Sequence, residues 1–153
     1  MANLDFSLQI PAPPNEMFAF FVPQRMPLWY GAEMDSQFEV QGGSSEFATG
    51  QKVRITGKLG RRNVALTVVV TAYEWERLLE WKFQDSFGVR GLQRWELLPV
   101  PSGTRLSMRD SYAMPGALGR FFDLIFTRHA VARRDRSWLA RLQKLATRSK
   151  SIG

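Results

Sequence analysis

The sequence predicts an α+β domain in which a curved seven-stranded antiparallel sheet grips one long C-terminal helix. Between residues 36 and 112 the chain shows only strand patterns joined by short turns, which favours antiparallel pairing. From Pro115 to about Thr147 apolar residues recur instead with the period of an amphipathic helix. A twisted sheet of this size curls, and its concave face needs an apolar partner such as this helix.

The first strand is predicted at residues 5–10, where Phe6, Leu8 and Ile10 alternate with polar side chains. The prolines that follow end this strand, and we expect a short helix over 15–21 and a second short helix or turn over 24–30. Alternating or β-branched runs then predict six more strands, at residues 36–41, 51–58, 63–74, 77–85, 89–98 and 104–112.

The length of 153 residues suits a single domain, which we place at residues 1–148, with residues 149–153 as a flexible tail. The absence of cysteine excludes disulfides, thiol catalysis and zinc–thiolate sites. One histidine without cysteine argues against a transition-metal site, and no motif points to a cofactor. The N-terminus lacks a signal-peptide pattern and no apolar run is long enough to span a membrane, so we expect a cytoplasmic protein.

The net charge of +7 comes entirely from the C-terminal region. Residues 1–114 hold 12 basic and 12 acidic side chains, whereas residues 115–153 hold 9 basic and 2 acidic ones. This basic helix is either a solvated face or a contact for an anionic partner such as a membrane surface. Nucleic acid is disfavoured as that partner because the aromatic residues lie elsewhere in the chain.

Several segments, in this order, resemble the START-like superfamily, the helix-grip fold shared by Bet v 1-like and polyketide cyclase/dehydrase-like proteins. They are the run Ala12-Pro13-Pro14-Asn15-Glu16-Met17-Phe18, the segment around Trp29, the run Gly103-Thr104-Arg105-Leu106, and the entry to the helix at Tyr112 and Pro115-Gly116. The resemblance implies a cavity between sheet and helix that holds an apolar or amphipathic small molecule. The functions of this superfamily diverge widely, so the fold alone does not select one.

Helix periodicity and strand alternation give the candidate ligand-binding residues, and the alternative is that the same side chains fill a solid core. The helix supplies Phe122, Ile125, Phe126 and His129, and the strands supply Phe38, Val53, Ile55, Trp81, Phe83, Trp95 and Met108. Trp29 and Tyr30 are expected at the mouth of the cavity.

His129, the only histidine, falls on the predicted inner stripe of the helix with Phe122 and Ile125. Three roles stay open for it: a general acid or base, a polar anchor for a ligand, or a buried structural histidine paired with Asp110 or Tyr112. Asp110 lies near the end of the last strand, and the pattern leaves open whether it or Arg109 points inward. Trp138 lies on a flanking stripe, where we expect it to pack on the first strand or the short helices, or else to mark a homodimer contact.

These observations favour a protein that binds a hydrophobic small molecule in an internal cavity. The first alternative is a cyclase- or dehydratase-like enzyme acting on a polyketide-type substrate, with His129 and Asp110 as weak candidates for proton transfer. The second is an interaction module that uses its basic helix on an anionic partner.

Overall fold

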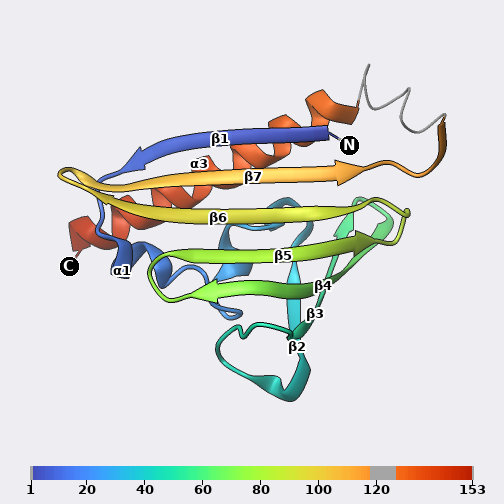
Figure 1. The fold of residues 1–153 in the computed structure, drawn as a ribbon, viewed down its shortest axis with the longest axis horizontal. Coiled ribbons are helices and arrows are strands. Elements are labelled where there is room, and N and C mark those ends of the chain that lie inside the picture. The colour runs from blue at the N-terminus through green and yellow to red at the C-terminus, as the bar shows by residue number, and fades with distance from the viewer. Residues whose placement is uncertain (1, 118–126, 153) are drawn as a thin grey trace.

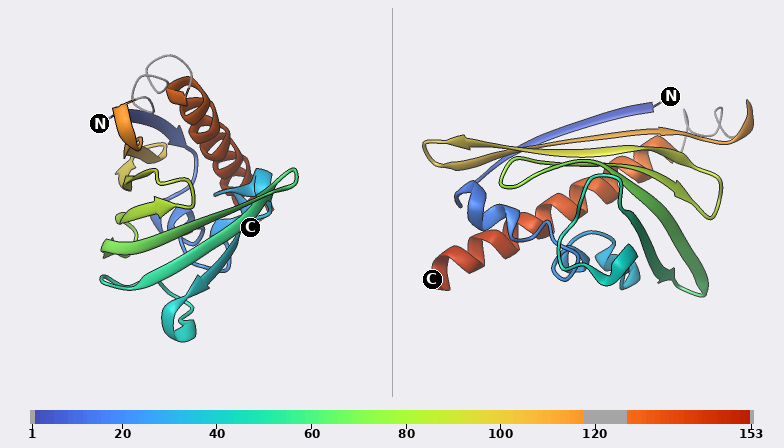
Figure 2. Two further views of the ribbon diagram at one scale, coloured as in Figure 1. Left: turned by 90° about the vertical axis from the view of Figure 1, so that its right-hand side faces the viewer. Right: turned by 60° about the horizontal axis from the view of Figure 1, so that its bottom comes forward.

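The computed structural model describes residues 2–117 and 127–152, and it confirms the α+β architecture predicted from the sequence. Seven antiparallel strands form one curved sheet in the order β1-β7-β6-β5-β4-β3-β2. The helix α3 (Arg128–Ile152) crosses one face of this sheet diagonally and passes close to β1 (Figure 1). Figure 2 shows the short helical segments on the same side, so the described elements cover one face of the sheet.

Each predicted strand is present, with small shifts at the ends. The strands are β1 (Ala2–Ile10), β2 (Gln37–Val40), β3 (Lys52–Leu59), β4 (Arg62–Glu74), β5 (Leu78–Asp85), β6 (Arg90–Val100) and β7 (Gly103–Ala113). From β2 to β7 each strand pairs with the next one along the chain. The exception is β1, which pairs with β7 so that Leu8 lies opposite Leu106. This one long-range pairing brings the start of the chain beside its last strand.

The helical segments after β1 are shorter than predicted. They are α1 (Pro14–Phe18) and the 3₁₀ turns η1 (Met26–Leu28) and η2 (Ala32–Met34), and a further turn, η3 (Gln41–Gly43), follows β2. Trp29 and Tyr30 come directly after η1 and have no exposed surface, so the prediction that they form a mouth is wrong. They are buried because their polar atoms find partners inside: the Trp29 indole donates to the Phe20 carbonyl at 2.9 Å.

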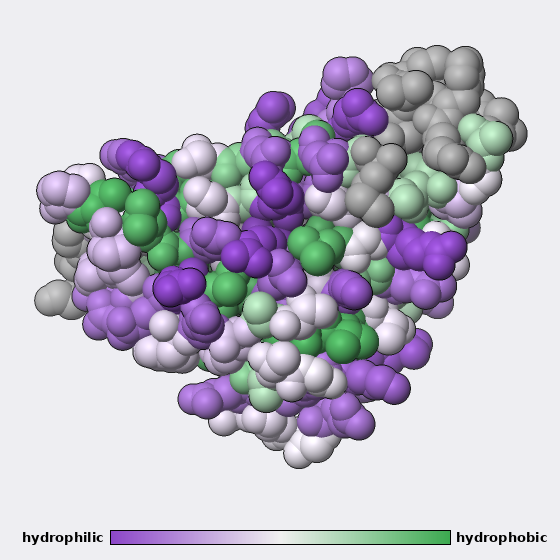
Figure 3. Space-filling view, viewed as in Figure 1, coloured by the Kyte–Doolittle hydropathy of each residue, from purple (hydrophilic) through white to green (hydrophobic). Residues whose placement is uncertain are grey.

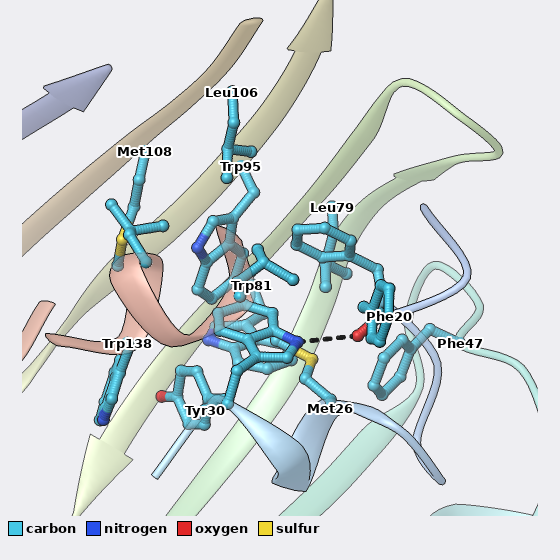
Figure 4. Close-up of a cluster of buried hydrophobic side chains, with 14 of the residues drawn as sticks. Phe20, Met26, Tyr30, Phe47, Leu79, Trp81, Trp95, Leu106, Met108 and Trp138 are labelled. Carbon is cyan, nitrogen blue, oxygen red and sulfur yellow. Dashed lines mark hydrogen bonds between the residues drawn. The ribbon is translucent and has the colours of Figure 1, made fainter. Parts of the chain in front are cut away.

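Large aromatic side chains make up the centre of the core. Trp29, Trp81 and Trp95 are fully buried and meet edge to face, with ring centroids 5.1 to 5.9 Å apart in the pairs that Trp95 makes with the other two. Tyr30 packs against the same group and lies beside Trp138 of α3 (Figure 4). Edge-to-face contacts of this kind add stability beyond the area buried, so this cluster fixes how the sheet, η1 and α3 fit together.

The buried face of α3 differs from the predicted one. The side chains that α3 buries are those of Asp135, Trp138, Leu139, Leu142 and Ala146. His129 is exposed, so its predicted position on the inner face is wrong. The predicted phase rested largely on apolar residues between 118 and 125, which lie outside the described residues. An aspartate, Asp135, begins the buried face of α3 and hid its apolar pattern. Trp138 packs against Tyr30 of the η1 segment, as one of the two alternatives predicted.

The predicted start of the C-terminal helix cannot be compared with α3, whereas its predicted end can. The expected helix start at Pro115 is followed by residues 118–126, which lie outside the described residues. At the other end α3 continues to Ile152, so residues 149–152, predicted as a flexible tail, are helical. In the described part of the chain, no helix is long and apolar enough to cross a membrane.

The open face of the sheet carries many polar side chains with apolar ones scattered among them, as Figure 3 shows. Arg109 points to this face and pairs with Asp5 at 2.9 Å, and Arg94 pairs there with Glu80 at 2.6 Å. Because successive residues of a strand point to opposite faces, Asp110 points inward, where its side chain is fully buried. This settles the orientation of Arg109 and Asp110 that the sequence left open.

The observed phase of α3 predicts which leucines matter. Leu142→Ala removes a fully buried side chain from the inner face of α3, and we expect it to lower the free energy of unfolding by about 2–5 kcal/mol. Leu98→Ala, at a side chain that is 55% exposed on β6, is the control and should change it by less than about 0.5 kcal/mol. Urea denaturation measures both, and equal losses would contradict the assigned helix face.

Candidate functional site

A cavity of about 250 Å³ lies between the inner face of the sheet and α3. Most of its wall is apolar: Leu59, Val64, Leu66, Phe83, Phe87, Val89, Met114 and Val131. The polar groups on the wall come from four parts of the chain and include Tyr30, Gln93, Asp110 and Arg134. An apolar pocket with a few convergent polar groups is the usual form of a small-molecule site, and its volume is just below the range of about 300–1,000 Å³ common for such sites.

Gln93 of β6 organises the polar wall from the sheet side. Its Oε1 accepts hydrogen bonds from the Tyr30 hydroxyl at 2.7 Å and from the Trp81 indole N–H at 2.9 Å. Its Nε2 donates to Asp110 Oδ2 on β7 at 3.4 Å. Burial raises the pKa of the Tyr30 hydroxyl, so Tyr30 remains a hydrogen-bond donor at neutral pH.

Arg134 joins this wall from the side of α3. Its Nη2 donates to Asp110 Oδ2 and to Asp135 Oδ1, at 3.2 Å in both cases. The two aspartates are fully buried, whereas the Arg134 side chain keeps 37% of its surface accessible and lines the cavity. Burial works against the charge of Arg134, but Asp135 and Asp110 outweigh it, so its pKa is raised and it stays cationic.

Two carboxyl groups therefore share one guanidinium in the interior. Asp110 Oδ1 and Asp135 Oδ2 have no other hydrogen-bond partner among the described residues. Arg134 brings the two carboxyl groups together, and two buried carboxyl groups beside one cation favour a proton on one of them. Burial, followed by the neighbouring carboxyl group of Asp110, raises the pKa of Asp135 to about 9. The Asp110–Asp135 pair consequently holds one proton at neutral pH.

Two exposed apolar side chains stand at the rim of the cavity. Leu59 lies at the β3–β4 turn and Phe87 at the β5–β6 turn, and their exposed fractions are 48% and 50%. The Arg62 guanidinium lies 5.4 Å from the centre of the Phe87 ring, which shows that the two turns are neighbours. The turns thus frame one end of the cavity, and Asp85 holds the Phe87 turn by accepting from the backbone N–H groups of Phe87 and Val89.

The structure brings only part of the predicted ligand-binding set to this cavity. Tyr30 and Phe83 line it. Six of the predicted residues are instead buried in the surrounding core: Trp29, Val53, Ile55, Trp81, Trp95 and Met108. Phe38 is partly buried. Those side chains fill a solid core, which was the alternative to a ligand-binding role in the sequence analysis. The described structure thus draws fewer cavity residues from the strands than strand alternation suggested.

None of the helix residues predicted for the site is found among the described cavity-lining residues. Phe122, Ile125 and Phe126 lie outside the described residues. His129 is exposed and is not among the cavity-lining residues described here, whereas Asp110 lines the cavity, so the proposed pairing of these two groups in catalysis loses its geometric basis.

Sequence reasoning missed Gln93, Arg134 and Asp135. Arg134 was counted with the basic face, yet it turns to the cavity. A signal did exist for Asp135: it is the only acidic residue between Arg128 and Arg148, and it stands four residues after Val131 and three before Trp138. An isolated acid in that register on a basic helix indicates a buried partner, because burying an unpaired carboxylate is costly.

A second hollow, of about 1,120 Å³, lies on the open face of the sheet. Its floor consists of outward-facing side chains such as Thr67, Val69 and Leu92, with Arg54 and Lys82 beside them. It is larger than the cavity, but among its described lining residues only Ser111 is a buried polar side chain, and its hydroxyl already donates to Asn3 Oδ1 at 2.6 Å. The interior cavity is therefore the better candidate site.

The shared proton predicts a pH-dependent stability. Unfolded Asp135 loses its proton near pH 4, whereas the native pair keeps it up to about pH 9. Stability due to this proton is fully present below about pH 4 and is lost as the pH rises towards 9. The free energy of unfolding of the unmodified protein should therefore fall between about pH 4 and 9 by on the order of a few kcal/mol more than that of Asp135→Asn.

Urea denaturation at a series of pH values measures this difference. Glu39→Gln, which changes an exposed carboxylate on β2, is the matched control and should keep the pH dependence of the unmodified protein. Parallel curves for Asp135→Asn and the unmodified protein would exclude a shared proton.

Comparison with known proteins agrees with this geometry. A family model described as "Polyketide cyclase / dehydrase and lipid transport" matches residues 1–147. No curated protein sequence gives a significant match. Among solved structures, protein MLL2253 from Mesorhizobium loti is similar with a TM-score of 0.75 at 20% identity, over 96% of this chain and 98% of that one.

Two further solved structures show the same arrangement. A protein from Rhodobacter sphaeroides has a TM-score of 0.72 at 25% identity, over 94% of this chain and 90% of that one. Protein SA2116 from Staphylococcus aureus reaches 0.75 at 10% identity, over 98% and 96% of the two chains. These likenesses, together with the curved sheet and its last helix, confirm the helix-grip resemblance. Because the family model matches nearly the whole chain, the protein belongs to the polyketide cyclase / dehydrase and lipid transport family.

Proposed function

We propose that the protein binds a small, largely apolar molecule in the cavity between the sheet and α3. The observation that carries this proposal is the meeting of an apolar wall with a hydrogen-bonded polar cluster made by Tyr30, Gln93, Asp110 and Arg134. The apolar wall supplies affinity through removal of hydrocarbon from water, and the cluster orients the ligand. Membership of a family that includes lipid transport supports the same function.

A pair of substitutions on one strand separates the cavity from the outer hollow. Leu66 lines the cavity, and its neighbour Thr67 points to the outer face. Leu66→Trp fills part of the cavity, so we expect an apolar fluorescent probe to bind at least about tenfold more weakly, while Thr67→Trp leaves its binding unchanged. Titration by fluorescence, with circular dichroism to check folding, measures this. The opposite pattern would move the site to the open face of the sheet.

A second candidate function is proton-transfer catalysis, which the Asp110–Asp135 pair favours. A carboxyl group that keeps its proton at neutral pH can donate it to a carbonyl oxygen, and the resulting carboxylate can remove a proton from the adjacent carbon. Asp110 and Asp135 thereby take the place of the His129 and Asp110 pairing considered from the sequence. This chemistry is a part of cyclisation and of dehydration, which the family description names.

Exchange of carbon-bound hydrogen tests this candidate directly. Cyclohexanone in deuterium oxide should exchange the hydrogens beside its carbonyl faster with the protein than without it, and nuclear magnetic resonance follows the exchange. Asp135→Asn should remove the acceleration, by about a hundredfold or more if the pair is the acid–base group. Glu39→Gln should retain it. An exchange rate equal to that of buffer would leave ligand binding as the function.

A further inference from the structure

The cavity is acidic, although the protein as a whole is strongly basic. Among the described residues that line the cavity, Glu33, Asp85 and Asp110 carry acids and Arg134 alone carries a cation. Asp135 adds a fourth carboxyl group directly behind this wall. The chain has a net charge of +7, so the excess of acids on the cavity wall is opposite in sign to the net charge of the chain.

The excess is concentrated where the charges are buried. One guanidinium, that of Arg134, serves both Asp110 and Asp135, and each aspartate has one oxygen without another partner among the described residues. A buried carboxylate needs a cation or a proton, and here a proton fills that role. The site therefore has a place for one further positive charge.

Aromatic rings line the same cavity as Asp110. The rings of Tyr30 and Trp138 lie 4.3 Å apart between centroids, and both residues line the cavity with Phe83 and Phe87. The Arg134 guanidinium already lies 4.5 Å from the centre of the Trp138 ring. The faces of aromatic rings attract cations, and aromatic walls beside a carboxylate are a known way to bind organic ammonium groups.

We infer that the cavity selects an organic cation, a protonated amine on a compact apolar body, whose ammonium group replaces the proton shared by Asp110 and Asp135. This inference rests on the proposed function, because it names the chemical class of the ligand for the same cavity. Charge balances in the exchange: one positive charge enters with the amine, and one proton leaves to solvent. Arg134 stays in place and keeps its contacts with both aspartates.

The groups that face the pair set the pH dependence. They are Tyr30 and Glu33 from the segment before β2, Gln93 from β6, and Arg134 and Trp138 from α3. Tyr30 is neutral, Glu33 accepts a hydrogen bond from Trp138 at 2.7 Å, and Arg134 is cationic, so the shared proton is the group that exchanges near neutral pH. Because the amine competes with this proton, its affinity should rise by about tenfold per pH unit between about pH 6 and 8.

Three probes of nearly equal shape test the charge preference: benzylamine, benzyl alcohol and benzoate. Isothermal titration calorimetry of the intact protein at pH 7 should show benzylamine binding at least about tenfold more tightly than benzyl alcohol, with benzoate weakest. Repeating the benzylamine titration in two buffers with different heats of ionisation should show release of about one proton per amine bound.

Variants of the acid pair remove the preference without changing shape. Asp135→Asn and Asp110→Asn each leave one carboxylate for one guanidinium, so the amine should lose its advantage over the alcohol, and proton release should stop. Glu39→Gln should behave as the unmodified protein. The proton count in the unmodified protein stands on its own if either variant fails to fold.

The outcomes separate this inference from the proposed function. If benzyl alcohol binds as tightly as benzylamine and Leu66→Trp weakens both, the cavity is a ligand site but its charge preference is wrong. Amine binding without proton release also overturns the inference. If benzylamine and benzyl alcohol both fail to bind, and an apolar fluorescent probe fails to bind as well, the inference and the proposed function are both wrong.

Discussion

The contact of Arg134 with two buried carboxyl groups is the constraint on which the site depends. It joins α3 to β7, the last strand, and it does so inside the protein where unpaired charges are costly. One guanidinium with two carboxyl groups is stable there only with a further positive charge, which the shared proton supplies. This arrangement ties α3 to the sheet at one point and sets the polarity of the cavity wall beside it.

Aromatic packing holds the same elements in register. Trp138 of α3 packs against both the Arg134 guanidinium and the Tyr30 ring, and its indole N–H donates to Glu33. Tyr30 in turn reaches Gln93 of the sheet through its hydroxyl group. A helix held by both apolar and polar contacts has one preferred rotation about its axis, because each contact type fails if the helix turns. The polar wall of the cavity is thus held by contacts from both the sheet and α3, which suits a preorganised binding site.

The fold of this protein is shared with other solved structures, whereas the chemistry of the site depends on individual residues. The helix-grip arrangement extends to solved structures of 10–25% identity, so it constrains the architecture and leaves the ligand open. Within this architecture, the cavity wall of this chain carries a glutamine that organises the sheet side and an aspartate–arginine–aspartate cluster at the helix side. That chemistry supports the proposals on ligand class and on proton transfer.

The sequence by itself determined the strands, the turns between them and the presence of a long amphipathic helix. These follow from local patterns: alternation along each strand, prolines and glycines at the turns, and apolar residues at helical spacing. It could not determine the phase of α3. From the sequence alone, an aspartate such as Asp135 is expected to be exposed to solvent. Its burial is explained only by the neighbouring Arg134 and Asp110, and Asp110 is 25 positions away in the sequence. Only the tertiary structure decided that a buried acid belongs there, because the free energy of burying a charge depends on partners that distant parts of the chain bring together.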